Sequence, residues 1–269
     1  MSEASDPRFF SQSGESIRAR LDQEMSAALG HTVLSLKEKM AVACRLLADE
    51  GHARTLAGQV TVRDSGGSGY WTTGFGAGLA ETTVTNLVRV DDSMTPIEGP
   101  GMPNPAVRFH LWIYQRRPDL NCIIHTHPPH CCALGLIDEP LSVAHMDAAV
   151  FYDDCAFLRT WPGLPVANEE GQTIADALGG KRSILLAHHG ILTTGSSLEE
   201  ALYLAVLFEH AAEVQLLARS TGERIRQIDP ALARDAHDFM LKTSMINGTF
   251  DYWSRRTIKR HPDLLHAAP

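Results

Sequence analysis

Several features that mark particular classes of protein are scarce or absent in this sequence. Five cysteines occur among 269 residues; they form no Cys-x-x-Cys pair, and their number is odd. This pattern does not fit a disulfide framework, and it predicts reduced, buried thiols in a cytoplasmic protein. The N-terminus shows no basic region followed by an apolar core, so no signal peptide is expected.

Basic residues and long apolar runs are also scarce. Lys and Arg number 24 against 32 Asp and Glu, and the net charge of −8 argues against nucleic acid as a partner, since phosphate binding needs a basic face. The longest apolar runs, such as residues 201–208, fall far short of the ~18 residues that a membrane-spanning helix requires. With 44% hydrophobic residues, the chain is expected to be globular, with no membrane partner and with a small molecule as its substrate.

Histidine is plentiful, with 13 residues, and two of them follow an apolar run that ends at a Pro-Pro pair. The run Cys122-Ile123-Ile124 predicts a short buried strand. Side chains at positions i and i+2 of a strand point to the same face, so His125 and His127 should project together. His189, in the apolar segment 183–190 that we predict as a second strand, is the candidate third ligand. Three imidazoles leave a coordination position open, which is typical of a catalytic metal.

The remaining pattern predicts helices that interleave with strands. Further strands are expected near residues 58–63, 70–73, 87–90, 95–98 and 141–143, and helices near 17–29, 35–51, 105–116, 130–137, 169–178, 197–219 and 230–245. Ser-x-x-Glu capping boxes at Ser35 and Ser197 support two of the helix starts. Because several strands join through short Gly turns, a mixed, largely antiparallel sheet flanked by helices fits better than a doubly wound one.

The expected organisation is an N-terminal arm (1–30), a metal-binding domain (31–222) and a C-terminal helical extension (223–269). The extension ends in a basic run, 255–260, which we interpret as a solvated tail. Within the domain, Thr72-Thr73-Gly74-Phe75-Gly76 offers hydroxyls and backbone N–H groups suited to a phosphate or a carboxylate. A plain glycine-rich turn is the alternative interpretation of that loop.

A set of motifs, in this order, resembles the class II aldolase and adducin superfamily over residues 35–219. They are Arg108-Phe109-His110, Tyr114-x-x-Arg117-Pro118-Asp119, His125-Thr126-His127-Pro128 and Ala187-His188-His189-Gly190. The resemblance implies an α/β fold, a three-layer α/β/α sandwich, and a homotetramer with active sites between subunits. It places His125, His127 and His189 at the zinc-binding positions and leaves His110, His130 and His188 with supporting or rim roles. Adducin itself shows that the fold also occurs without enzyme activity.

The departures from the family pattern concern the acid–base group and the phosphate contacts. Sugar-phosphate aldolases carry a catalytic carboxylate where this chain has Ala106, and a methyl group cannot take a proton. The phosphate-binding segments appear here as Gly58-Gln59-Val60-Thr61 and Trp71-Thr72-Thr73-Gly74. Gln59, Thr72, Thr73 and Gly74 are therefore the candidate substrate-binding residues, for a substrate other than a sugar phosphate.

His145 is the candidate that replaces the missing acid, because the resemblance aligns it with a tyrosine acid contributed by a neighbouring subunit. An unperturbed imidazole titrates near pH ~6.5 and exchanges protons at neutral pH. Tyr152 is a second candidate from the same region, with Asp147 and Asp153 as weaker ones. A packed histidine at a subunit interface is the alternative for His145.

Three functions compete at this point. The first is a metal-dependent carbon–carbon lyase, of aldolase or decarboxylase type, acting on a small carbonyl compound or 2-oxo or 2-hydroxy acid, with zinc as the family metal. The second is a non-haem Fe(II) oxygenase, since the chain also resembles the aldolase-fold oxygenases that cleave aryl 2-oxo and 2-hydroxy acids with O2. The third is an adducin-like, non-catalytic module, and the presence of all three histidines argues against it. The lyase is the preferred hypothesis.

Overall fold

The computed structural model describes residues 12–29, 33–64, 66, 68–164 and 167–265. Within these residues, eight strands form one sheet in the order β4-β3-β2-β1-β5-β8-β7-β6. Only β6 and β7 pair in parallel, and the other neighbours are antiparallel. The strands are β1 (Gln59–Arg63), β2 (Tyr70–Thr73), β3 (Leu87–Val90), β4 (Pro96–Glu98), β5 (Cys122–Thr126), β6 (Cys155–Leu158), β7 (Ser183–Leu186) and β8 (Gly190–Gly195). The predicted mixed, largely antiparallel sheet is confirmed.

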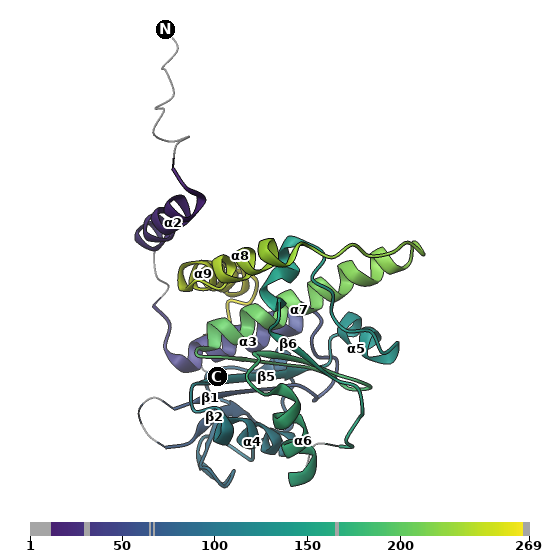
Figure 1. Ribbon diagram of the computed structural model, residues 1–269. Coiled ribbons are helices and arrows are strands. Elements are labelled where there is room, and N and C mark those ends of the chain that lie inside the picture. Colours follow the sequence, from purple (N-terminus) through teal and green to yellow (C-terminus); the bar gives the residue numbers. More distant parts are fainter. Residues whose placement is uncertain (1–11, 30–32, 65, 67, 165–166, 266–269) are drawn as a thin grey trace.

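Helices cover both faces of this sheet, which makes the three-layer sandwich that the resemblance implied (Figure 1). Helices α4 (Arg108–Arg116) and α6 (Asn168–Leu178) pack together on one face. The other face carries α3 (Leu36–Asp49), α5 (Pro129–Leu136), α7 (Leu198–Arg219), α8 (Pro230–Met240) and α9 (Thr243–Arg260). The short 3₁₀ helices are η1 (Leu79–Glu81), η2 (Pro105–Val107) and η3 (Met146–Phe151).

Each face of the sheet has its own apolar core. Ile123 and Leu192 face α4 and α6, whereas Ile124 and Ile191 face the core beneath α3 and α7. Alternation along β5 and β8 explains this division, because successive side chains of a strand point to opposite faces. Helix α7 is long and apolar enough to span a membrane by length and composition, but 56% of its apolar window is buried inside the molecule. It is therefore the central core helix on its face.

The predicted capping box is complete at the start of α3 and half formed at the start of α7. Ser35 accepts from the Glu38 N–H, and the Glu38 carboxylate accepts from the Ser35 N–H, which completes the capping box of α3. Ser197 caps α7 in the same way. The Glu200 carboxylate, however, accepts from Ser196 instead, so the second capping box is only half formed.

The predicted strand at 141–143 is wrong, because partners outside a β-ladder hold this backbone. The N–H of Ser142 donates to the side chain of Gln215 at 2.7 Å, and the carbonyl of Val143 accepts from Ile228 at 3.1 Å. The edge strand lies further on, as β6, which the sequence analysis did not predict. Its parallel pairing with β7 gives the sheet its mixed character.

The C-terminal helical region also differs from the prediction. Two helices replace the single one expected, since extended backbone at Lys242 separates α8 from α9. The basic run 255–260 lies inside α9 and is not a solvated tail. Arg256 pairs with Glu50, and Arg260 pairs with Asp49 at 3.0 Å, so the run fastens α9 to the end of α3.

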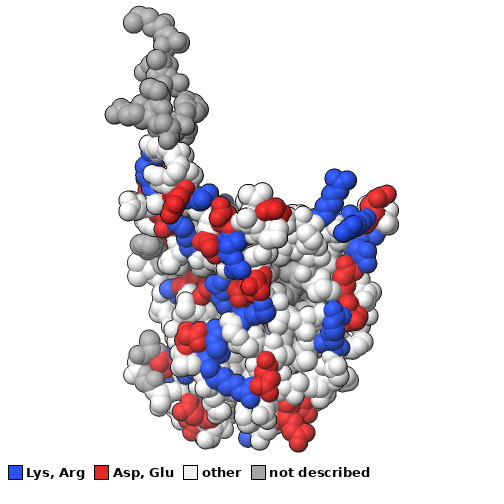
Figure 2. Space-filling model, viewed as in Figure 1, with Lys and Arg blue, Asp and Glu red and all other residues white. Residues whose placement is uncertain are grey.

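The predicted N-terminal helix is present as α2 (Gly14–Ala28), and residues 1–11 and 30 of the predicted arm lie outside the described residues. α2 has no buried residue; it meets α9 through polar groups such as Asp22, which accepts from Ser244 at 2.5 Å, and through apolar ones such as Met25 and Ala28. On the face shown in Figure 2, basic and acidic side chains alternate without a large area of one sign.

A buried charge network joins the sheet edge to α7 and α8. The Arg182 guanidinium donates to Asp154 at 2.5 Å and to Glu200 at 2.9 Å, and its third nitrogen lies 3.2 Å from His237 Nε2. His237 Nδ1 lies 2.7 Å from Asp238 Oδ1. Asp154, Glu200 and His237 are each less than 10% exposed. The Asp154 carboxylate, 3.6 Å from His237 Nε2, raises the pKa of His237 above its ordinary 6.5, and the hydrogen bond to Asp238 adds to this.

The raised pKa of His237 predicts a pH-dependent share of stability. The folded state binds this proton more tightly than the unfolded state, so the stabilisation is complete below pH 6.5 and is lost as pH rises through the folded pKa. We expect His237→Asn to lower the free energy of unfolding by about 1 kcal/mol more at pH 6 than at pH 8.5, as measured by urea denaturation. His188→Asn, at an exposed position, is the control and should show no such difference. Equal losses at both pH values would contradict the assignment.

Candidate metal centre

The three predicted histidines come together where β5 meets the turn before β8. The antiparallel register sets His125 opposite Leu192 and Thr126 opposite Ile191, so residues 187–189 fall beside the end of β5. The predicted strand 183–190 is too long, because β7 ends at Leu186 and His189 lies in the turn. His188 adopts a φ of 59°, and the chain reverses there with His188 exposed and His189 half-buried.

The ring nitrogens of the three histidines face one another. His125 Nε2 lies 3.1 Å from His127 Nε2 and 3.2 Å from His189 Nε2, and the three candidate ligand atoms all lie within 4.8 Å of one another. With a metal–nitrogen bond of 2.0–2.1 Å, octahedral and tetrahedral geometry place neighbouring nitrogens about 3.0 and about 3.4 Å apart. The two separations from His125 fall between these limits, and the whole set lies close enough to share one divalent ion.

The protonation states suit metal binding. The His125 Nδ1–H donates to the carbonyl of Ile191 at 2.8 Å, which leaves the Nε2 lone pair directed at the other two rings. Burial lowers the pKa of all three imidazoles, that of His189 to about 4, and the neighbouring histidines lower those of His125 and His189 further. The rings are therefore neutral at physiological pH, which is the state that binds a metal.

Two further residues hold the triad, and the sequence analysis assigned a role to neither. His52 is fully buried; its Nδ1 lies 2.8 Å from Thr126 Oγ1, and its carbonyl accepts from the His127 N–H at 3.1 Å. Gly190 leaves room for the backbone of β5, since a Cβ there would lie 2.3 Å from the Thr126 carbonyl and 2.7 Å from His127 Cδ2. The Ala187-His188-His189-Gly190 motif could have predicted a role for the glycine, whereas no motif in the sequence includes His52.

The candidate substrate-binding residues lie on the strands and loop next to the triad. Gln59 is the β-partner of His125, and the buried Gln59 Oε1 and Thr72 Oγ1 have no hydrogen-bond partner within the described residues. Thr73 is buried at the end of β2, and Gly74 forms an isolated bridge with Pro103.

The segment that carries Ala106 lies close to this loop. The N–H of Phe75 donates to the carbonyl of Met102, and the side chain of Asn104 donates to the carbonyl of Leu56, close to the strand that pairs with β5. Ala106 lies in η2, which contacts β1, the strand that pairs with β5. His110, on α4 behind it, is buried and hydrogen-bonded to Thr61, and burial lowers its pKa to about 3.

His145 and Tyr152 have no contact with the triad among the residues that the structure describes. His145 packs against His210 with ring centroids 6.0 Å apart, and burial lowers its pKa from 6.5. Tyr152 lies beneath the guanidinium of Arg234 at 4.7 Å. Of the weaker candidates, Asp147 lies 3.5 Å from His210, and Asp153 pairs with Lys181 and Arg234.

A family model described as "Class II Aldolase and Adducin N-terminal domain" matches residues 38–216, which include the triad and all four candidate substrate-binding residues.

Two curated relatives come from Streptomyces. One, from Streptomyces roseochromogenus subsp. oscitans, is named 4-hydroxy-3-prenylphenylpyruvate oxygenase/4-hydroxy-3-prenylbenzoate synthase; it is 31% identical over 87% of this chain and 86% of its own length. The second, decarboxylase NovR from Streptomyces niveus, is 34% identical over 70% of this chain and 71% of its own length. Among solved structures, L-fuculose 1-phosphate aldolase from Glaciozyma antarctica superposes with a TM-score of 0.79 at 26% identity, covering 91% of this chain and 99% of the other.

The geometry predicts which histidines bind a metal. We expect His125→Ala, His127→Ala and His189→Ala each to abolish stoichiometric binding of Zn²⁺, because each removes one of three ligands. His188→Asn should leave binding intact, since His188 is exposed and Asn tolerates a positive φ. The measurement is metal content after dialysis against a weak chelator. Full occupancy in any triad variant would show that the ion lies elsewhere.

Proposed function

The chain belongs to the class II aldolase and adducin family, and from this membership we propose that it is a metal-dependent carbon–carbon lyase. Its substrate would be a small carbonyl compound, most specifically a 2-oxo or 2-hydroxy acid, and not a sugar phosphate. The observation that carries the proposal is an intact histidine triad combined with alanine at position 106.

The triad supports a metal-dependent reaction through the arrangement of its donors. His125, His127 and His189 would hold one divalent ion, with zinc as the family metal, and leave positions open for a substrate. Such an ion supplies Lewis acidity that polarises a carbonyl or carboxylate group. The chain's part is to keep the three rings neutral and aligned, which the Ile191 carbonyl and the burial of the site achieve.

The neighbouring side chains support a substrate other than a phosphate ester. Gln59 Oε1 and Thr72 Oγ1 are buried, uncharged and without an internal partner, so they suit hydroxyl or carbonyl groups of a ligand. Thr73 and Gly74 extend this polar edge at the end of β2. We propose these residues as the substrate-binding set, and none of them brings the positive charge that a phosphate dianion needs.

The missing proton donor restricts the chemistry further. Ala106 cannot transfer a proton, and burial lowers the pKa of both His52 and His110 to about 3, which makes each a weak base at neutral pH. We propose that His145 of a neighbouring subunit, with a neutral imidazole, accepts the proton as a general base in a homotetramer, with Tyr152 as a second contributor from the same region. This assembly would explain why neither residue reaches the triad of its own chain.

An O2-dependent cleavage of an aryl 2-oxo or 2-hydroxy acid, with Fe(II) at the triad, is the second candidate. It is favoured by the relative named as an oxygenase, which matches this chain over 87% of its length. It also dispenses with the carboxylate absent at position 106. An adducin-like module without catalysis fits less well, because a structural role gives no reason to align three unprotonated nitrogens.

Metal content and oxygen dependence distinguish the two enzymatic candidates. For protein purified without added metal, we expect bound zinc and retro-aldol cleavage of the probe 4-hydroxy-2-oxo-4-phenylbutanoate, an aryl 2-oxo acid, to pyruvate and benzaldehyde at the same rate in air and under argon. Fuculose 1-phosphate should not be cleaved. Bound iron with stoichiometric O2 uptake would replace the lyase by the oxygenase. Failure of the metal-loaded protein to cleave the 2-oxo acid in either gas, with cleavage of the sugar phosphate instead, would contradict both.

Ala106→Glu is the companion variant for this experiment. A carboxylate at this position would crowd the open side of the triad, so we expect it to suppress whichever activity the wild type shows. Aldol cleavage of fuculose 1-phosphate gained without any loss would indicate instead an aldolase that has lost only its base.

The proposed role of His145 predicts a variant that keeps its structure but loses turnover. His145→Phe should retain the tetramer and the metal and reduce kcat by about 10²-fold or more, which is typical for removal of a general acid or base. Light scattering and metal analysis are the controls, and Tyr152→Phe provides the comparison for the neighbouring phenol. Wild-type turnover in His145→Phe would leave this histidine with a packing role only, and a monomeric wild type would contradict the shared site.

A further inference from the structure

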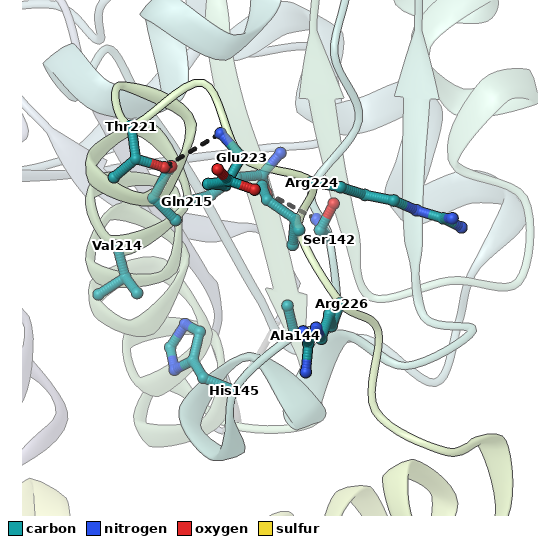
Figure 3. A pocket seen from close by; sticks show the side chains of 11 residues that line it. Ser142, Ala144, His145, Val214, Gln215, Thr221, Glu223, Arg224 and Arg226 are labelled. Carbon is teal, nitrogen blue, oxygen red and sulfur yellow. Dashed lines mark hydrogen bonds between the residues drawn. The ribbon is translucent and has the colours of Figure 1, made fainter.

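A hollow lies between the end of α7 and the loop that follows it, and none of the three triad histidines lines it (Figure 3). Its volume is about 320 Å³, within the range of small-molecule sites. Three segments form its walls: residues 142–145, the last turns of α7, and residues 221–226. The hydrogen bond from the Ile228 N–H to the Val143 carbonyl holds the third segment against the first.

The floor of the cavity is apolar, and its polar groups are already engaged. Val214 and Ala218, one turn apart on α7, and Ile225 are its apolar lining residues beside Ala144. Gln215 is 4% exposed; its oxygen accepts from Ser142, and its nitrogen donates to Glu139 and Pro140. A ligand on this floor would therefore meet hydrocarbon and no unsatisfied amide.

The charged groups lie towards opposite ends. In Figure 3, Arg226 lies beside Ala144 towards His145, Glu223 lies near Thr221, and the side chain of Arg224 runs away from His145. Within the described part of the chain, Arg226 makes no ion pair and no side-chain hydrogen bond. Its guanidinium is the positive charge at this end, since burial lowers the pKa of His145 and keeps that ring neutral.

We propose that this cavity binds an organic acid, with the carboxylate on Arg226 and an apolar or aromatic body over Val214, Ala218 and Ile225. A guanidinium recognises a carboxylate through paired hydrogen bonds, and an arginine without a protein partner is free to make them. Glu223 at the other end disfavours a second negative charge and accepts from a hydroxyl. A hydroxyaryl carboxylate matches both ends. His145, at one edge of this cavity, is the residue that we propose to reach a neighbouring subunit's triad, whereas Arg226 and the apolar floor do not depend on that proposed reaction.

The test uses 4-hydroxyphenylacetate, which lacks the 2-oxo group that would chelate a metal at the triad. Titration calorimetry on the metal-loaded, full-length protein should show one saturable site per chain. We expect Arg226→Gln to weaken binding about tenfold or more, the usual effect of removing a charge-assisted hydrogen bond. Arg224→Gln removes the same charge from a side chain that points away, and should bind like the wild type. Both positions are exposed, so neither change should disturb folding.

Two further arms separate this site from the triad. Binding should persist in His189→Ala, which disables the triad, and should fall for tyrosol, the analogue with a hydroxyl in place of the carboxylate. If His189→Ala loses binding and Arg226→Gln binds like the wild type, the acid binds at the metal, and the proposal is overturned. Equal weakening by Arg226→Gln and Arg224→Gln would mean that the acid responds only to general surface charge, which contradicts the proposed site. Absence of saturable binding in the wild type would refute the proposal.

Discussion

The antiparallel pairing of β5 with β8 is the constraint on which the candidate centre depends. It places the turn 187–189 beside the end of β5, and so it brings His189 to His125 across a sequence separation of 64 residues. The same ladder provides the Ile191 carbonyl that fixes the His125 tautomer. Gly190 is part of this arrangement, because the two backbones approach so closely there that a Cβ would meet the Thr126 carbonyl. The strand pairing that forms this part of the sheet therefore also places the three histidines.

The parts of the structure that the sequence predicts are those encoded by short-range pattern. The i, i+2 spacing of His125 and His127 and the capping residues Ser35 and Ser197 express strand and helix geometry directly, and the structure contains each of them. The motif set predicts the family and its sandwich, which the comparisons confirm. His52 could not be predicted in this way, since its contact with Thr126 spans 74 residues and no local feature marks it.

The errors have the same physical origin. Residues 141–143 are β-prone, but Gln215 and Ile228, both distant in sequence, take their backbone hydrogen bonds, so tertiary partners override the local preference. The run 255–260 looks like a charged tail, yet pairing of Arg256 and Arg260 with the end of α3 holds it in a helix. The charge of a segment does not indicate whether another helix or strand provides an ion-pair partner for it.

The triad and the acid–base group are structurally separable in this architecture. The three ligands depend on β5, β8 and the turn at Gly190, whereas position 106 lies on η2, outside the sheet. Position 106 can therefore change without moving the ring nitrogens of the triad, and with alanine there His125 Nε2 lies 3.1–3.2 Å from the other two. The candidate metal ligands lie at the end of the sheet and position 106 lies on a separate segment, so a substitution at 106 leaves the triad in place. Proteins named as aldolase, decarboxylase and oxygenase are all similar to this chain, so its reaction has to be argued from the site and not from the fold.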